Sequence, residues 1–478
     1  MKKENSKRGI WALVLLLVLL LLVAAGVVIM QSVANPADKE ISKVDISEAS
    51  SLKEYSGVDA FEDVPVMEGA NIRFEEAVDY GNDTFGINAY DTTLDEYQAY
   101  LKKLEKAGFK KYVDNGEQGL EGYVYKAHYQ KDEALVTVTH IVSMGRTKIA
   151  ASSKGEVTEH LFYQEEYIAD NKAGAKTTLH FPELYNMGAS FVIQLKNGHF
   201  IINDGGSQTE LPYLLDYLDS LVPEGEKPVV EAWFISHCHQ DHIGVLKRFF
   251  DERSYLDRLY VENVYYNEMS KESMQYFDQL EEVSDWFGYM RGVPALMKST
   301  SGKAPNVYQP SMGDRLYIND ITVDVVFSQE MLPYNELGNT NGSSLWFMYN
   351  IEGQKVLFTA DGIWPAQMFI KDTYDKEYLD LAVYFTPHHG ADVYNEFTNY
   401  LAGVGTVLYT NDHVIDGRGD KEGTKVVQNQ RLLSLAEEAF SYGEGTVVMT
   451  FPYEVGTAKI LPLQEWIYNR KPPTRWEE

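Results

Sequence analysis

Three histidines and an aspartate stand close together near the middle of the chain. His237 and His239 are two positions apart, and alternate side chains of an extended segment point the same way. They can therefore present two imidazoles to one metal ion. Asp241 and His242 follow where the chain turns, so they can reach a second ion nearby. The whole chain has 11 histidines, and three of them within six positions indicate a metal site rather than a polar surface loop.

Two further carboxylates stand at the ends of expected strands. Asp361 follows a strand of buried type, where a carboxylate can bridge two cations because each oxygen can bind one of them. Taken alone, this pattern is also ordinary turn chemistry. Asp204 ends an earlier strand and can accept a hydrogen bond from a ligand histidine. Asp361 is therefore a candidate ligand that bridges two ions, and Asp204 is a candidate hydrogen-bond partner of a ligand histidine.

Adjacent histidines follow the strand expected at 381–385. His388 and His389 cannot easily bind one ion from the same strand, so we expect one to coordinate and the other to face substrate. His413 lies after the next strand and is a further candidate for acting on substrate. We take Asp241, His388 and His413 as the candidate catalytic residues.

The elements that must position these side chains alternate between strand and helix, which is typical of an α/β domain. Asn197-Gly198 is a strong hairpin signal between two strands, and the strand expected at 229–236 runs directly into the histidine segment. A helix is expected to start after Gly244. The other expected elements are helices at 211–221 and 429–439, a helical, aromatic cover at 262–294, and strands at 315–318, 321–327, 345–349, 356–359, 381–385, 446–450 and 457–461.

The first third of the chain predicts an anchor, a linker and a small domain. Residues 9–30 are uncharged and apolar after a basic start, which predicts a single-pass transmembrane helix with residues 1–8 in the cytoplasm and the rest outside the cell. A cleaved signal peptide is the alternative. Residues 31–57 are expected to be a linker. Residues 58–155 are expected to form a small α+β domain without chemistry, a spacer or docking module.

Composition narrows the choice of partners. The chain has 478 residues, 44% of them hydrophobic, and this length indicates two folded units. Its formal net charge of -29 disfavours nucleic acid as a partner, because phosphate contacts need Lys and Arg. Its single cysteine, Cys238, excludes an internal disulfide and a zinc site built on paired cysteines.

The order of these motifs resembles the metallo-β-lactamase superfamily over roughly residues 177–463. The segment at 341–344, Asn-Gly-Ser-Ser, together with Thr-Ala-Asp-Gly at 359–362, resembles one branch of it, which includes the metallo-hydrolase domain of competence proteins and surface phosphorylcholine esterases. The resemblance implies a four-layer αββα sandwich at 160–470, with the site along one edge of the sheets. The motifs that carry it are Asp204-Gly205-Gly206, His237-x-His239-x-Asp241-His242, Asp361 and His388-His389-Gly390.

The resemblance also implies a ligand set for two divalent ions. His237 and His239 would bind the first ion, Asp361 would bridge, and His388 would face substrate, although His388 and His389 could exchange roles. Many members have a further histidine for the first ion, and this chain has none between Ile243 and Ala360. We therefore expect an open first site with zinc, or manganese as the harder alternative. The second ion would be bound by Asp241, His242 and His389, and Asp204, Asn341 and Ser344 would support the ligands, with Ser343 a further candidate.

These expectations favour a membrane-anchored, extracellular, dinuclear metal-dependent hydrolase. The branch resemblance favours a phosphodiester of a cell-surface polymer or a small molecule as substrate. A competence-type nuclease is the first alternative, and the charge balance disfavours it. A metal-binding surface module without catalysis is the second alternative. Hydrolysis of β-lactams is disfavoured by the missing histidine and by the insertion at 262–294.

Overall fold

The computed structural model describes most of the chain after its first 48 residues. All of the described residues belong to one compact unit, residues 43–478. The described ranges are 49–75, 78–81, 84–153, 171–184, 188–277, 280–333, 335–410, 424–442 and 445–461.

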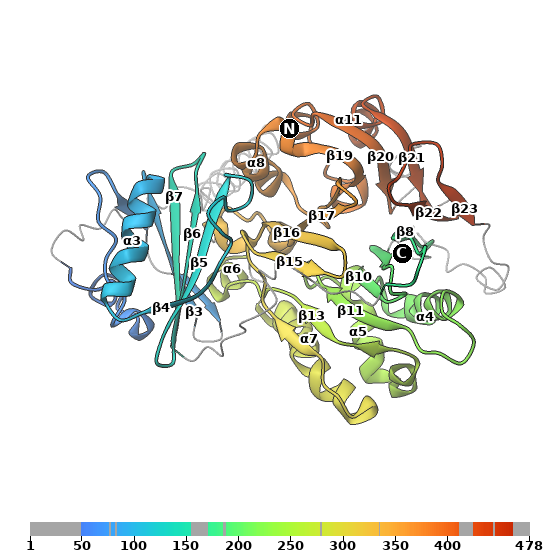
Figure 1. The fold of residues 1–478 in the computed structure, drawn as a ribbon, viewed down its shortest axis with the longest axis horizontal. Coiled ribbons are helices and arrows are strands. Elements are labelled where there is room, and N and C mark those ends of the chain that lie inside the picture. Colours follow the sequence, from blue (N-terminus) through green and yellow to red (C-terminus); the bar gives the residue numbers. More distant parts are fainter. Residues whose placement is uncertain are drawn as a thin grey trace, which may run out of the picture. The chain divides into compact units, whose positions relative to one another are not determined.

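The N-terminal domain, residues 49–153, is an antiparallel sheet with the strand order β1-β3-β7-β6-β5-β4 and with β2 paired to β3. Helix α3 lies across one face of this sheet (Figure 1). Thr93 caps α3 through a reciprocal capping box with Glu96, and Tyr100 and Leu104 of the helix are buried against Val138 and Ile149 of the strands. The elements are α2 Leu52–Ser56, β1 Arg73–Phe74, β2 Val78–Gly81, β3 Thr84–Tyr90, α3 Leu94–Lys106, β4 Lys110–Asp114, β5 Val124–Lys131, β6 Ala134–Ile141 and β7 Arg146–Ser152.

The opposite face of this sheet is polar and yet buried. Lys126 and Lys148 are 1% and 3% exposed. The ammonium group of Lys126 lies 2.7 Å from the carboxylate of Asp314, and Lys148 donates to the backbone carbonyl of Glu330 at 2.7 Å. Both acceptors belong to the C-terminal domain, so this face of the sheet packs against that domain through buried lysine side chains.

The C-terminal domain, from residue 171 onward, contains two sheets packed face to face. Among the described residues one has nine strands and the other seven. Phe234 of the first sheet and Phe347 of the second have ring centroids 4.7 Å apart, and Phe191 and Phe358 are 5.2 Å apart. The strands of the first sheet are β8 Thr178–Phe181, β9 Ser190–Gln194, β10 Phe200–Asp204, β11 Val229–Phe234, β12 Tyr260–Val261, β13 Asn263–Tyr265, β14 Asn306–Tyr308, β22 Thr446–Thr450 and β23 Lys459–Leu461. Those of the second are β15 Arg315–Ile318, β16 Ile321–Phe327, β17 Trp346–Ile351, β18 Gln354–Phe358, β19 Asp380–Phe385, β20 Gly403–Tyr409 and β21 Ala436–Ser441.

Helices cover the outer faces of both sheets. Phe249 of α5 packs against Trp233 of β11, with ring centroids 6.0 Å apart, and Phe369 of α8 packs in the same way against Phe327 of β16, at 5.4 Å. The order of layers in this domain is therefore helix, sheet, sheet, helix. Among the described residues, the α-helices of the domain are α4 Leu211–Ser220, α5 Gln240–Asp251, α6 Lys271–Tyr276, α7 Leu280–Ser301, α8 Trp364–Thr373, α9 Asn395–Thr398 and α11 Thr424–Leu433.

Parallel pairing brings the chemistry-bearing strand ends to one edge. Strand β10 runs parallel to β11, and β18, β19 and β20 are also mutually parallel. The backbone amide of Leu345 donates to the carbonyl of Ser236 at 2.9 Å, which ties the two sheets together at this edge. The residues that follow β10, β11, β18 and β19 therefore meet.

Three expected elements differ from the structure. Helix α5 begins at Gln240, because the chain turns immediately after His239 rather than after Gly244. The helix expected at 429–439 ends at Leu433, and Ala436–Ser441 is a strand instead, because it pairs in parallel with β20. The cover expected at 262–294 begins with a strand, β13, so tertiary pairing overrides local propensity in both places.

The expectation of a transmembrane anchor, and with it a cell-membrane location, is corrected. Crossing a bilayer takes about 20 consecutive apolar residues in one helix. In the part of the chain that the structure describes, every helix is too short or too polar for this. Even α7, with 22 residues, carries acidic and basic side chains. Residues 1–48, which include the predicted span, lie outside the described ranges.

Candidate metal centre

Two groups of metal-ligand atoms lie at the edge where the strand ends meet. Within each group the ligand atoms all lie within 4.8 Å of one another. One residue, Asp361, belongs to both groups. The first group is His237, His239 and Asp361, and the second is Asp241, His242, Asp361 and His389.

The histidine segment reaches this edge by passing from a strand into a helix. His237 follows the end of β11, His239 is the N-cap residue of α5, and Asp241 and His242 occupy the first turn of that helix. The ring centroids of His237 and His242 are 4.2 Å apart. Gly244 allows α5 to pack closely against the backbone of Ser207 and Gln208, because a Cβ atom there would lie 2.6 Å from the backbone nitrogen of Gln208.

The carboxylate of Asp361 lies between the two groups. Its Oδ1 atom is 3.0 Å from Nε2 of His242 and 3.6 Å from Nε2 of His389. Its Oδ2 atom is 3.8 Å from Nε2 of His237. The side chain is 2% exposed, so each oxygen of one buried carboxylate faces a different set of imidazoles.

Several atoms of the cluster are buried without a hydrogen-bond partner among the described residues. They are Nε2 of His237, Nε2 of His242 and Oδ1 of Asp361. A buried polar atom left unpaired costs about 1–3 kcal/mol, and a cation between these atoms would remove that cost. Imidazole nitrogens and carboxylate oxygens are ligands that zinc accepts, so the residues present fit divalent cations.

Hydrogen bonds behind the cluster fix two of the imidazoles. Nδ1 of His242 donates to Oδ2 of Asp204 at 2.7 Å, and Asp204 also accepts from the backbone amide and the hydroxyl of Ser236, both at 2.7 Å. Nδ1 of His389 lies 2.5 Å from the hydroxyl of Thr410, and its Nε2 lies 3.0 Å from Asp241. Thr410 is absent from the sequence-based set, because only the turn after β19 brings His389 to it.

The backbone is strained at the strand ends that carry the cluster. Left-handed φ angles, which are uncommon for residues other than glycine, occur at Asp204 (50°), Ala360 (44°), His388 (49°) and His389 (55°). The backbone amide of His388 donates to the carbonyl of Ala360 at 2.9 Å. Such strain persists where surrounding contacts enforce it, and it gathers at functional sites.

The two adjacent histidines differ in their surroundings. The side chain of His389 is 4% exposed, whereas that of His388 is 31% exposed. Nε2 of His388 lies 3.7 Å from Oδ2 of Asp361 and 3.3 Å from Nδ2 of Asn341. His389 thus belongs to the buried second ligand group, and His388 lies on the solvent side of that group.

Two of the predicted supporting residues, Asn341 and Ser344, contact the cluster. Asn341 is 5% exposed and contacts His388, as described above. The hydroxyl of Ser344 accepts a hydrogen bond from the backbone amide of Asp361 at 3.3 Å, whereas the hydroxyl of Ser343 bonds to the carbonyl of Thr340. His413 lies outside the described residues.

Burial and neighbouring charges set the protonation states. Burial lowers the pKa of His237 well below its ordinary value, and the neighbouring imidazoles add to this. Burial acts to lower the pKa of His242 as well, but the carboxylates of Asp361 and Asp204 outweigh it and raise that pKa. Burial acts to raise the pKa of Asp361, but the imidazoles around it outweigh this and hold that pKa well below its usual range. Neutral imidazole at His237 and ionised carboxylate at Asp361 are the forms that bind metals.

Comparisons with known proteins agree with the type of site. Residues 186–393 match the model of the metallo-beta-lactamase superfamily. The chain therefore carries a domain of this superfamily, whose members are generally metal-dependent hydrolases. Its narrower similarity to the competence-protein and phosphorylcholine-esterase branch stays a prediction.

Among solved structures, two similar chains are a metallo-β-lactamase with a HARLDQ motif from Cronobacter sakazakii and Zn²⁺-bound PqqB from Methylobacterium extorquens. The first is 14% identical with a TM-score of 0.24, over 39% of this chain and 63% of that one. The second is 12% identical with a TM-score of 0.27, over 50% of this chain and 64% of that one. This chain therefore spans less than two thirds of the length of either. No curated protein sequence matches the chain.

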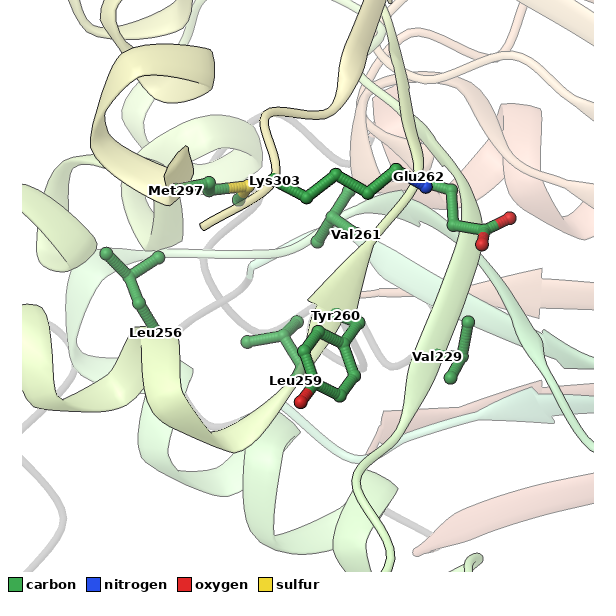
Figure 2. A pocket seen from close by; sticks show the side chains of 8 residues that line it. All are labelled: Val229, Leu256, Leu259, Tyr260, Val261, Glu262, Met297 and Lys303. Carbon is green, nitrogen blue, oxygen red and sulfur yellow. The ribbon is translucent and has the colours of Figure 1, made fainter. Parts of the chain in front are cut away.

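A separate pocket lies away from the metal centre. Its volume is about 220 Å³, and it is lined by Val229 at the start of β11, Tyr260 and Met297 among others (Figure 2). The ligand segment from His237 to His242 follows the other end of β11. The concave surface in Figure 2 is therefore not the site that the histidines form.

Proposed function

We propose that the chain is a metal-dependent hydrolase that acts on a phosphodiester and uses two divalent cations, zinc or alternatively manganese. The observation that carries this proposal is the buried carboxylate of Asp361, whose two oxygens face two separate groups of ligand atoms. A carboxylate in that position suits a bridge between two ions. The ligands of the proposed site are His237, His239, Asp241, His242, Asp361 and His389.

The charge balance of the site favours an anionic substrate. Two divalent ions would bring four positive charges, and the carboxylates of Asp204, Asp241 and Asp361 bring three negative ones. Imidazoles are neutral when they bind a metal, and the charge of a protonated His388 is balanced by its partner Asp392, so a net positive charge remains for a phosphodiester. Bound cations of this kind polarise a phosphoryl or carbonyl oxygen and lower the pKa of water.

His388 is placed to deliver a proton to the leaving group. Burial acts to lower its pKa, but the hydrogen bond to Asp392 and the charge of Asp361 outweigh this and raise that pKa. In the metal-free chain the imidazole therefore keeps a proton more readily than a free histidine, and a protonated imidazole is the form that a general acid requires. Its partial exposure at the edge of the ligand cluster leaves room for substrate.

The test is metal analysis of the full chain together with its rate on a panel of substrates. We expect bis(p-nitrophenyl) phosphate to be cleaved by the zinc- or manganese-loaded protein and not after chelation. Activity should return when the metal is restored. Loaded protein that cleaves no phosphodiester would contradict the proposed substrate, and cleavage of p-nitrophenyl acetate instead would point to a carboxylic ester.

Two alternative functions give different results in the same panel. A competence-type nuclease would cleave DNA, although a net charge of -29 opposes binding to a polyanion. A metal-binding module without catalysis would hold the ions and turn over none of the substrates. The strained backbone at His388 and His389 favours a catalytic role over such a passive one.

A further inference from the structure

We propose that Asp392 is a positioning residue that holds the imidazole of His388 over the metal centre, with Asn341 at the other ring nitrogen. The proposal rests on the function proposed above, in which His388 acts on substrate. It adds a residue that carries no role in the sequence-based set of candidates.

The side-chain contacts of Asp392 define the orientation of His388. One carboxylate oxygen of Asp392 is hydrogen-bonded to Nδ1 of His388, and the other accepts from the hydroxyl of Tyr394 at 3.3 Å. A carboxylate accepts hydrogen bonds, so Nδ1 must carry the proton. In the neutral ring, Nε2 is then the basic atom, and it faces Asp361 at 3.7 Å and Asn341 at 3.3 Å.

A buried amide fixes the segment that carries Asp392. Gln367 of α8 is fully buried, and its amide donates to the carbonyl of Asp392 at 2.6 Å and to that of Gly362 at 3.0 Å. The same side chain accepts from the backbone amide of Tyr394 at 3.3 Å. Because Gly362 directly follows Asp361, this amide ties the support of His388 to the position of the proposed bridging carboxylate.

The hydrogen bond to Asp392 matters for the orientation of His388 because this side chain is partly exposed. With 31% of its side chain exposed, His388 is not confined by packing, in contrast to His389. A charge-assisted hydrogen bond restricts such a ring to one rotamer and one tautomer. Loss of a partner of this kind lowers activity through misorientation, not through loss of the metal ligands.

The kinetic test compares Asp392→Ala and the isosteric Asp392→Asn with Tyr394→Phe. We expect both Asp392 variants to keep their metal content and KM while kcat falls by about 10- to 100-fold. Tyr394→Phe, which leaves the contact to His388 intact, should keep the full rate. In a His388→Gln background, Asp392→Ala should cost nothing further, because its effect passes through His388. An equal loss in both backgrounds, or a loss of metal, would overturn the proposal.

A second measurement does not depend on activity. Nitrogen-15 NMR of the histidine side chains in the metal-free full chain, assigned with His388→Gln, reports which ring nitrogen carries the proton. We expect a protonated Nδ1 at His388 in the wild type and a shift toward protonated Nε2 in Asp392→Ala. An unchanged tautomer refutes the positioning role. If the wild type cleaves no substrate, the proposed function fails, while this measurement still decides the role of Asp392.

Discussion

Nδ1 of His242 donates a hydrogen bond to Asp204 at 2.7 Å, and both side chains are completely buried. The bond leaves Nε2 of His242 as the atom that faces Asp361. It also joins the end of β10 to the first turn of α5, so the position of the imidazole depends on how these two elements pack. A ligand that is held from behind in this way needs little rearrangement to bind an ion.

Asp204→Asn should weaken metal binding without abolishing it. We expect the affinity for the ion at His242 to fall by about 10- to 100-fold, because a supporting hydrogen bond is weakened while the ligand remains. Competition with a chromophoric chelator measures this. Ser236→Ala is the comparison, since it keeps the bond between Asp204 and His242 and removes a hydroxyl that contacts both Asp204 and Nδ1 of His237. Equal affinities in Asp204→Asn and the wild type would show that the contact does not support the ligand.

Asp361→Ala should lower metal occupancy at both sites. The reason is that one carboxylate faces both ligand groups, with Oδ1 near His242 and Oδ2 near His237. Metal content after gel filtration gives the stoichiometry, and His239→Ala, which removes a residue of the first group alone, is the comparison. A wild-type stoichiometry in Asp361→Ala would rule out bridging.

The adjacent histidines should give different phenotypes when replaced. His389→Ala should lower metal affinity, because its Nε2 belongs to the second ligand group. His388→Ala should keep the metals and slow turnover by about 10²–10⁴-fold, the range for lost proton transfer. Metal content and the rate on an activated phosphodiester separate the two. Exchanged phenotypes would mean that the ligand assignment is reversed.

Stability should fall between pH 6.5 and pH 4 because of two buried histidines away from the site. Burial lowers the pKa of His140 and of His180 from 6.5 to about 4. Below pH 6.5 the unfolded chain takes up protons that the folded chain refuses, so the stability present above pH 6.5 is lost as the pH falls toward 4. For one such residue the loss reaches about 3 kcal/mol, since one pKa unit corresponds to about 1.4 kcal/mol.

Thermal unfolding followed across this pH range checks the effect. His140→Gln should flatten the curve, because an amide does not titrate and can still bond to the hydroxyl of Thr147, which lies 2.9 Å from the imidazole in the wild type. His199→Gln is a useful control, since His199 is more exposed and burial does not dominate its pKa. A curve for His140→Gln that is as steep as that of the wild type would contradict the assignment.

Residue types and spacing predict the ligand cluster better than they predict its supports. The segment from His237 to His242 can be recognised from the sequence alone, because closely spaced histidines with an aspartate are typical of metal sites. Thr410 and Asp392 cannot be recognised in this way. Each contacts a histidine through the left-handed turn at His388 and His389, and no local sequence pattern predicts that turn. The elements show the same contrast. The strands expected at 315–318 and 321–327 have these bounds in the structure as β15 and β16, whereas β21 is a strand because it pairs with β20.

The ion pair of Lys126 with Asp314 has a consequence for how the molecule can be divided. Both side chains are essentially inaccessible. Burial acts to raise the pKa of Asp314, but Lys126 and His128 outweigh it and lower that pKa to about 2, so the carboxylate stays ionised. Stranding such a charge by removing its partner costs about 3–5 kcal/mol. If the chain is cut between residues 153 and 171, the two fragments should therefore elute together in gel filtration. The fragment from residue 171 onward, expressed alone, should be less stable than the full chain, because Asp314 then lacks Lys126.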